Sequence, residues 1–271
     1  EEWKEIAQLI EENYNLFDGF LILHGTDTMA YTASVLSFML ENLAKPVIIT
    51  GSQIPLSEIR NDAFDNIITA LWLCAHKEIH EVCIYFNQRL LRGNRTKKIN
   101  AEGFNAFDSP NFPRLATIGI HIELRQNNLL PRPNDVFRLQ PIVPQFIANF
   151  RLFPGFSADV LAYLLQQPLR GLILETYGAG NAPNSDPRFL QLLTEACERD
   201  IVIINCTQCQ QGRVEMSQYA TGYSLKKAGL ISGHDMTSEA AHCKLLYLLS
   251  KKLNISDVKM LMEKNICGEL N

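Results

Sequence analysis

Three short loops of this sequence carry side chains that could act together on a small polar molecule. The first is His24-Gly-Thr-Asp-Thr28, the second is Gly51-Ser-Gln53, and the third is Arg92-Gly-Asn-Arg-Thr-Lys-Lys98. They offer hydroxyl, carboxylate and ammonium groups, which together can polarise a hydroxyl or a water and bind a charged substrate. Each loop follows a run that is typical of a buried strand, and ligands of open α/β sheets bind at the carboxyl ends of the strands. The three loops are therefore the candidate site.

Each loop also has a purely structural interpretation. The residues Thr26–Thr28 suit the N-cap of a helix expected from Met29, and spacing alone favours that cap. Ser52 is an ordinary turn residue, and His24 at a strand end is more often a hydrogen-bonded core residue than a catalyst. The five basic residues between Arg89 and Lys98 suit a solvated or RNA-binding stretch, although no aromatic residues interleave them.

Strands and helices alternate along the chain around these loops. Short apolar runs predict strands at 20–23, 47–50 and 82–86, and helical spacing predicts helices at 2–14, 29–41 and 61–76. Later, the same patterns predict strands at 147–152, 172–175 and 201–205, and helices at 157–167, 186–199, 238–250 and 256–264. Near-continuous apolar strands separated by helices are typical of a parallel sheet covered on both faces. The sequence therefore predicts an α/β fold.

A proline-rich stretch divides the alternating segments into two groups. Six prolines lie between positions 110 and 144, and residues 122–145 are expected to be a linker. The expected organisation is a larger N-terminal domain with a doubly wound parallel sheet, its first strand absent, in residues 1–121. A smaller C-terminal α/β domain is expected in residues 146–271. A chain of 271 residues is long enough for two domains.

Composition and charge argue against several classes of protein. The 25 Lys and Arg against 29 Asp and Glu give a net charge of −4, so a dedicated nucleic-acid binder is not expected. Apolar runs fall short of the ~18 residues of a membrane helix, and no secretory signal is visible. Seven cysteines, an odd and scattered set, favour a reducing, cytoplasmic compartment. Cys206-Thr-Gln-Cys209 has redox-motif spacing, but no second cysteine pair completes a zinc site.

Taken together, these segments resemble the signatures of the asparaginase/glutaminase family. Gly19–Ser34 is similar to the family's second signature, Thr50–Pro55 to its Thr-Gly-Ser-x-x-Pro turn, and Arg92–Lys98 with Phe107–Asn111 to its lysine loop. Further similar stretches are Tyr177–Pro183, Asn205–Cys209 and Tyr219–Gly222. The resemblance covers nearly the whole chain and is greatest to the cytoplasmic type I L-asparaginases.

The resemblance implies hydrolysis of the side-chain amide of L-asparagine to L-aspartate and ammonia, with no metal or other cofactor. It implies that Thr26, Asp27 and Lys98 form the family's Thr–Asp–Lys set, and that Gly25 and Ser52 join Thr26 and Asp27 in binding the substrate. The spacing from the lysine to the Phe-x-Ser-Pro-Asn stretch selects Lys98 as the family's lysine. Backbone amides near Gly25 are expected to stabilise the oxyanion formed at the attacked amide carbon.

Four further positions follow from the same resemblance. Lys97 and Cys209 lie where some allosteric members contact an effector asparagine, although Lys97 replaces a threonine there. Glu175 and Asn181 lie in the loop most like the part of a neighbouring subunit that completes the active site. A homodimer or homotetramer is therefore expected. From turn composition alone, residues 178–181 are equally a flexible strand exit.

The sequence departs from the family at its start. The family's first signature, Thr-Gly-Gly-Thr-Ile, carries the primary nucleophilic threonine on a central strand, and this sequence contains no Gly-Gly pair. We therefore expect roughly 65 further residues ahead of Glu1, which is consistent with an ordinary domain size, and we expect the chain without them to be inactive.

Two alternatives to an asparaginase stay open at this point. One is a catalytically inactive protein that binds asparagine or has a regulatory role. The other keeps the chemistry and changes the substrate, as a glutaminase or as the amidase component of a tRNA-amidating complex.

Overall fold

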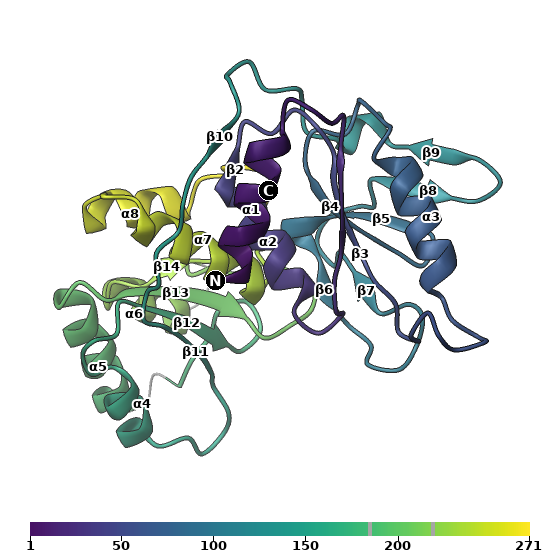
Figure 1. Ribbon diagram of the computed structural model, residues 1–271. Helices are drawn as coiled ribbons and strands as arrows, with labels where there is room; N and C mark the ends of the chain where they lie inside the picture. The colour runs from purple at the N-terminus through teal and green to yellow at the C-terminus, as the bar shows by residue number, and fades with distance from the viewer. Residues whose placement is uncertain (184–185, 218–219) are drawn as a thin grey trace. The chain divides into compact units, whose positions relative to one another are not determined.

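The computed structural model describes residues 1–183, 186–217 and 220–271, and Figure 1 shows its helices and strands. The chain forms two compact units. Unit 1 comprises Glu1–Pro141 with Cys267–Glu269, and unit 2 comprises Ile142–Ile266 with Leu270–Asn271. Tyr219, which opens the last of the family-like stretches, lies outside the described residues.

Unit 1 is built around a six-stranded sheet with the order β1-β3-β4-β5-β8-β9. The strands are β1 (Phe20–Leu23), β3 (Val47–Thr50), β4 (Val82–Phe86), β5 (Arg89–Arg92), β8 (Ala116–Ile118) and β9 (Ile122–Leu124). β1, β3 and β4 are parallel to one another, whereas β5, β8 and β9 run antiparallel to their neighbours. The predicted α/β class is confirmed, and the parallel part of this sheet is limited to its first three strands.

The antiparallel half of the sheet begins at a two-residue turn. Asn87 and Gln88 have φ values of 44° and 62°, and positive φ at both central residues is the geometry of the hairpin turns that join adjacent strands. The turn places β5 directly beside β4, with Phe86 opposite Arg89. No crossover helix is needed there, so the chain leaves the parallel pattern.

Helices and short strand pairs complete unit 1. They are α1 (Glu2–Asn13), α2 (Met29–Met39), α3 (Ala63–Leu73), η1 (Gly93–Arg95), η2 (Gln126–Asn128), the pair β2 (Leu40–Glu41) with β10 (Arg138–Leu139), and the pair β6 (Lys97–Lys98) with β7 (Phe107–Asp108). Every residue of β3 and β4 is buried, as are nine of the eleven residues of α2. This rigid core holds the loop between β1 and α2. Residues 122–141, within the expected linker, pack in unit 1 through β9 and β10.

Unit 2 contains a four-stranded, entirely parallel sheet with the order β11-β12-β13-β14. Its elements are β11 (Ile147–Arg151), α4 (Ala158–Leu164), β12 (Gly171–Thr176), α5 (Pro187–Glu198), β13 (Val202–Thr207), α6 (Ala220–Lys227), β14 (Ile231–Ser232), α7 (Ser238–Ser250) and α8 (Ile255–Met262). Leu172 and Leu174 of β12, Ile203 of β13 and Phe189 of α5 are fully buried in one core. The strand–helix alternation read from the sequence is thus the architecture of this unit.

Candidate active site

The structure brings Lys98 to both Thr26 and Asp27. The Lys98 Nζ donates a hydrogen bond of 2.8 Å to Thr26 Oγ1 and one of 2.7 Å to Asp27 Oδ1. The Lys98 side chain is 20% exposed, whereas the Asp27 side chain is 92% exposed. The ammonium of Lys98 therefore meets the hydroxyl and the carboxylate of two adjacent residues that lie 72 and 71 positions earlier in the chain.

Lys98 acts on the acidity of its carboxylate neighbour. The hydrogen bond from Lys98, together with its positive charge, lowers the pKa of Asp27 below its ordinary value. Asp27 is therefore ionised throughout the neutral range, and the open side of its carboxylate stays accessible to a cationic group from solvent.

Strand β6 determines which of the two adjacent lysines faces Thr26. Lys97 pairs with Asp108 and Lys98 with Phe107 in the antiparallel β6–β7 pair. Successive side chains of a strand point to opposite faces, so the two lysines diverge. Phe107 is buried and packs against Phe86 of β4, with ring centroids 5.1 Å apart. The β6–β7 pair is thus anchored to the main sheet, which fixes the position of Lys98.

Gln53 is a site residue to which the sequence analysis gave no role. Thr26 Oγ1 lies 3.4 Å from Gln53 Oε1, so the threonine hydroxyl accepts from Lys98 and donates to this amide oxygen. The Gln53 Nε2 in turn donates to the Gly103 carbonyl at 3.1 Å. The Gln53 side chain therefore links the turn after β3 to the loop between β6 and β7.

Helix α3 holds the turn that carries Gln53. The Asp62 carboxylate accepts from the backbone N–H groups of Gln53 and Ile54 at 3.0–3.1 Å. The buried Asn66 donates to the Gly51 carbonyl and to Asp62, at 3.0 and 3.2 Å. Asn66 is a polar residue on the buried face of α3, among Ala63, Ala70 and Leu73. A polar residue on an otherwise apolar helix face is the sequence signal that could have identified the hydrogen bonds between Asn66, Asp62 and the turn that carries Gln53.

The loop between β1 and α2 is not held by the expected helix cap. Thr28 is the N-cap residue of α2, and its side chain makes no capping hydrogen bond. Gly25 is exposed and has open space around its Cα. Ser52 is half-buried, and no described residue forms a hydrogen bond with its hydroxyl. The Thr28 hydroxyl of this loop and the Ser52 hydroxyl of the turn after β3 are therefore available for contacts other than helix capping.

The candidate residues of unit 2 lie around the carboxyl ends of its strands. Glu175 is in β12 and faces Arg151, with Nη1 and Oε2 3.9 Å apart. Asn181 closes a tight loop, because its backbone N–H and C=O both bond to Tyr177 at 2.8 Å. Cys209 is exposed, and its backbone N–H donates to Thr207 Oγ1 at 3.0 Å. Each therefore lies at the sheet edge where α/β proteins bind ligands.

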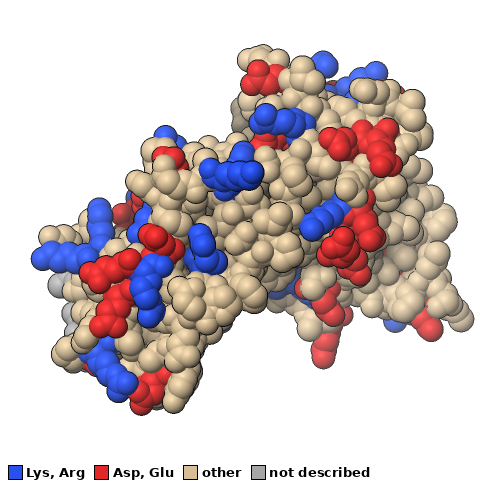
Figure 2. All heavy atoms as spheres, turned by 60° about the vertical axis from the view of Figure 1, so that its left-hand side comes forward, with Lys and Arg blue, Asp and Glu red and all other residues tan. Residues whose placement is uncertain are grey.

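The basic stretch after β4 is mostly internal rather than a nucleic-acid surface. Arg92 and Arg95 are only 5% and 2% exposed. Arg92 pairs with the buried Glu81, with Nε and Oε2 2.6 Å apart, and Arg95 donates to the Glu269 carbonyl at 2.6 Å. Acidic and basic side chains are interspersed on the face shown in Figure 2. The RNA-binding interpretation of this stretch therefore fails for Arg92 and Arg95, because they are buried in internal contacts.

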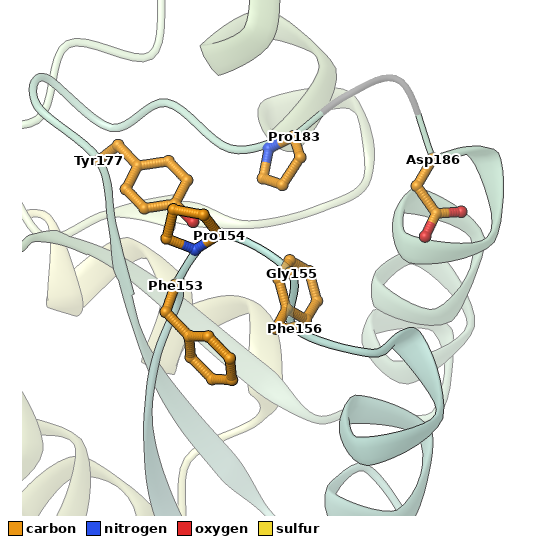
Figure 3. Close-up of a pocket in the computed structure, with 7 residues that line it drawn as sticks. All are labelled: Phe153, Pro154, Gly155, Phe156, Tyr177, Pro183 and Asp186. Carbon is orange, nitrogen blue, oxygen red and sulfur yellow. The ribbon is translucent and has the colours of Figure 1, made fainter.

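A separate pocket of about 320 Å³ lies in unit 2. Figure 3 shows its lining, which is mostly aromatic and proline side chains from the loops after β11 and β12, with Asp186 at the start of α5. It contains none of the residues predicted for the site.

Two further properties of the described residues bear on the class of protein. None of the helices in residues 1–183, 186–217 and 220–271 is both long and apolar enough to cross a bilayer. The same ranges contain no group of three or more His, Cys, Asp and Glu arranged to hold a metal ion.

Comparison with known families defines the class to which this fold and site belong. The protein-family model described as "Asparaginase, N-terminal" matches residues 1–130, and the family model described as "Glutaminase/Asparaginase C-terminal domain" matches residues 147–262. The chain therefore belongs to the asparaginase/glutaminase family, in its type I branch, as the resemblance predicted.

The chain is also similar over its whole length to individual proteins of known name. It is 53% identical over 272 residues to L-asparaginase 1 of Escherichia coli K12, covering 100% of this chain and 80% of that protein. It is 45% identical over 273 residues to the mouse 60 kDa lysophospholipase, covering 99% of this chain and 48% of that longer protein. The crystal structure of L-asparaginase I from Vibrio cholerae superposes with a TM-score of 0.94 at 49% identity, over 100% of this chain and 81% of that one.

Proposed function

We propose that this protein hydrolyses the side-chain amide of L-asparagine to L-aspartate and ammonia. The observation that carries the proposal is the bridge from Lys98 Nζ to Thr26 and Asp27, at 2.8 and 2.7 Å. The high identity to bacterial L-asparaginases supports the same reaction. Water is the second substrate, and its oxygen replaces the amide nitrogen, which leaves as ammonia.

Lys98 is the residue that activates the hydroxyl. A threonine hydroxyl is a poor nucleophile unless a neighbouring group takes or stabilises its proton. A charge-assisted hydrogen bond from Lys98 favours the deprotonated oxygen of Thr26, and a neutral Lys98 would accept that proton. A second threonine, outside residues 1–271, would supply the primary nucleophile that the family resemblance implies.

Asp27 and the nearby turn bind and polarise the substrate. The ionised, exposed carboxylate of Asp27 pairs with the α-ammonium of asparagine. The Ser52 hydroxyl, which has no bond to a described residue, donates to or accepts from the same substrate. The backbone amides at Gly25 and Thr26 stabilise the oxyanion that forms as the amide carbon is attacked.

Four further positions have secondary roles in the proposal: Glu175, Asn181 and Cys209 of unit 2, and Lys97 of unit 1. Glu175 and Asn181 contribute to the active site of a neighbouring subunit, and Lys97 and Cys209 are the positions of an effector site. Type I membership supports a cytoplasmic location, which is where the scattered cysteines also remain reduced.

The exposed face of α3 supports self-association with a second copy of this chain. Phe64, Ile68, Leu71 and Trp72 are each at least 50% exposed. Their spacing of i, i+4, i+7 and i+8 forms one apolar stripe, and such stripes on soluble proteins usually mark an interface. Sedimentation equilibrium should give at least twice the chain mass, and Leu71→Glu should lower it. A monomer at micromolar concentration would contradict a homodimer or homotetramer.

The direct test is ammonia release by the complete gene product, measured with L-asparagine and with L-glutamine. The proposal predicts a higher kcat/KM for asparagine. A lysophospholipid serves as a control ester, because the mouse relative carries that name. Calorimetric binding of asparagine without turnover would identify an inactive binding protein, and a higher kcat/KM for glutamine would identify a glutaminase.

A further inference from the structure

A chain of three side chains leads from the N-terminal helix to the loop that carries Thr26. The Trp3 Nε1 of α1 donates to Thr32 Oγ1 of α2 at 2.9 Å. The same hydroxyl lies 2.9 Å from His24 Nε2, and His24 Nδ1 lies 2.6 Å from the Gly25 carbonyl oxygen. Thr32 is 1% exposed, so its hydroxyl has to be satisfied by these partners rather than by water.

The directions of these hydrogen bonds follow from which atoms can donate. A carbonyl oxygen only accepts, so His24 Nδ1 must carry a proton to bond to Gly25. The indole N–H of Trp3 only donates, so Thr32 accepts from it and keeps its own proton to give. In a neutral imidazole Nε2 then has no proton, and Thr32 donates to it. One arrangement of protons therefore satisfies every atom of the neutral chain, Trp3 to Thr32 to His24 to Gly25.

The last bond of the chain fixes a peptide group beside the candidate site. In a planar trans peptide the C=O of Gly25 and the N–H of Thr26 point in opposite directions. A Gly25 carbonyl held on His24 therefore aims the Thr26 N–H away from His24. That N–H makes no hydrogen bond to a described residue, and it belongs to the residue whose hydroxyl accepts from Lys98.

We propose that Trp3, Thr32 and His24 are positioning residues that hold the Gly25–Thr26 peptide so that the Thr26 N–H is a preorganised donor to the amide oxygen of the substrate. The inference rests on the proposed amidase function and deepens it. Glycine at position 25 leaves the peptide free to rotate, since open space surrounds its Cα. The hydrogen bond from His24 restrains the carbonyl of this peptide, in addition to the side-chain contacts of Thr26 with Lys98 and Gln53. A donor aimed at a developing oxyanion acts mainly on the transition state, so its loss lowers kcat more than it changes KM.

The test compares Thr32→Val with Thr32→Ser in the complete gene product. Thr32→Val keeps the shape and removes the hydroxyl, and the proposal predicts a fall in kcat of about 10- to 100-fold with KM within about threefold. Thr32→Ser keeps the hydroxyl and should recover most of the lost kcat. Ser37→Ala is the matched control, because it removes a hydroxyl that bonds only within α2, to the Ala33 carbonyl at 2.8 Å.

Nitrogen NMR of the His24 imidazole supplies a readout that does not depend on turnover. The proposal predicts a protonated Nδ1 and an unprotonated Nε2 in the neutral ring, with this preference weakened in Thr32→Val and Trp3→Phe. A proton on Nε2 of the parent protein, or an unchanged kcat in Thr32→Val, would overturn the positioning role. If the parent protein released no ammonia, the proposed function would fail, while the NMR result would still decide the arrangement of protons.

Discussion

Asp27 is the most exposed of the three clustered site residues, and its carboxylate depends on Lys98 for its low pKa. We predict that NMR titration will place the pKa of Asp27 below 3.8, its ordinary value, and that Lys98→Met will raise it toward that value. Because the folded-state pKa is lowered, any stabilisation from this pair is present above the unfolded pKa and is lost as the pH falls through the folded one. An unchanged pKa in Lys98→Met would show that the contact does not persist in solution.

The cysteine thiols differ in their expected reactivity, because the structure buries some of them and exposes others. Burial raises the pKa of the Cys74 thiol to about 11 and that of Cys83 well above its ordinary value, whereas Cys209 is exposed. Since the thiolate is the reactive form, iodoacetamide at pH 7.5 should label Cys209 first, as read by peptide mass spectrometry. In urea the three should react at similar rates. Early labelling of Cys83 in the native protein would contradict the burial described here.

The two turns that carry site residues differ in whether they have room for an added side chain. A Cβ at Gly51 would lie 2.2 Å from the His24 carbonyl oxygen, which is backbone and cannot move aside cheaply. Gly51→Ala should therefore destabilise the protein by about 1–3 kcal/mol in urea unfolding and should also lower activity, because the same turn carries Gln53. At Gly25 a Cβ meets nothing within 4 Å, so Gly25→Ala should change stability by less than about 0.5 kcal/mol. Equal losses of stability in the two variants would refute this distinction.

The helices and strands that could be predicted from the sequence are those whose secondary structure is determined by their own residues. Strands 20–23, 47–50 and 82–86 are confirmed to the residue because each is a short apolar run. Burial also favours β3 and β4, whose residues are all buried, whereas no residue of β1 is buried. Helix 61–76 is shorter than predicted, Ala63–Leu73, since its ends depend on local caps. Strand β5 was missed because Gln88 adopts a positive φ without being glycine or asparagine, which leaves the single Asn87 as the turn signal in the sequence.

Some residues of the candidate site could be predicted from the sequence, and others could not. The family resemblance selected Lys98, Thr26 and Asp27, although spacing alone favoured a helix cap for the latter two, and the structure brings the three together. Their catalytic roles stay predictions. Gln53 stood in a candidate loop but received no role, because its importance comes from a contact with the distant Gly103 carbonyl. Asp62 was not singled out, and the buried Asn66 was the signal that could have led to it. His24 is hydrogen-bonded, as its structural interpretation predicted, but it is half-buried rather than a core residue, and its partners are Thr32 and the Gly25 carbonyl of the site loop.

At the scale of the whole chain, a buried ion pair fixes segments that are far apart in sequence. The Glu81 carboxylate accepts from Arg92 Nε at 2.6 Å and from the Leu130 N–H at 2.8 Å, and Arg92 also donates to the Asn128 carbonyl at 2.7 Å. Arg92 further reaches the Gly268 carbonyl at 3.3 Å. The basic stretch therefore serves the fold of unit 1.

Glu81→Gln tests the importance of that ion pair. The variant leaves the Arg92 charge buried without its counter-ion, so the free energy of unfolding should fall by about 3–5 kcal/mol. Asp159→Asn is the matched control, because the side chains of Asp159 and its partner Arg188 are 60% and 59% exposed, and exposed pairs contribute only about 0–1 kcal/mol. Urea unfolding followed by circular dichroism measures both. Similar small losses in the two variants would contradict a structural role for the buried pair.

The most direct measurement is ammonia release from L-asparagine by Lys98→Met compared with Lys97→Met in the complete gene product. The adjacent lysines carry the same charge, and β6 directs them to opposite faces. With Lys98 as the group that activates Thr26, Lys98→Met should lower kcat by about 10²- to 10⁴-fold. Lys97→Met, at a proposed effector position, can change how the rate depends on asparagine concentration but should keep kcat at saturating asparagine within a few-fold. Both variants should unfold at the parental urea concentration. Parental kcat in a folded Lys98→Met variant would contradict the account.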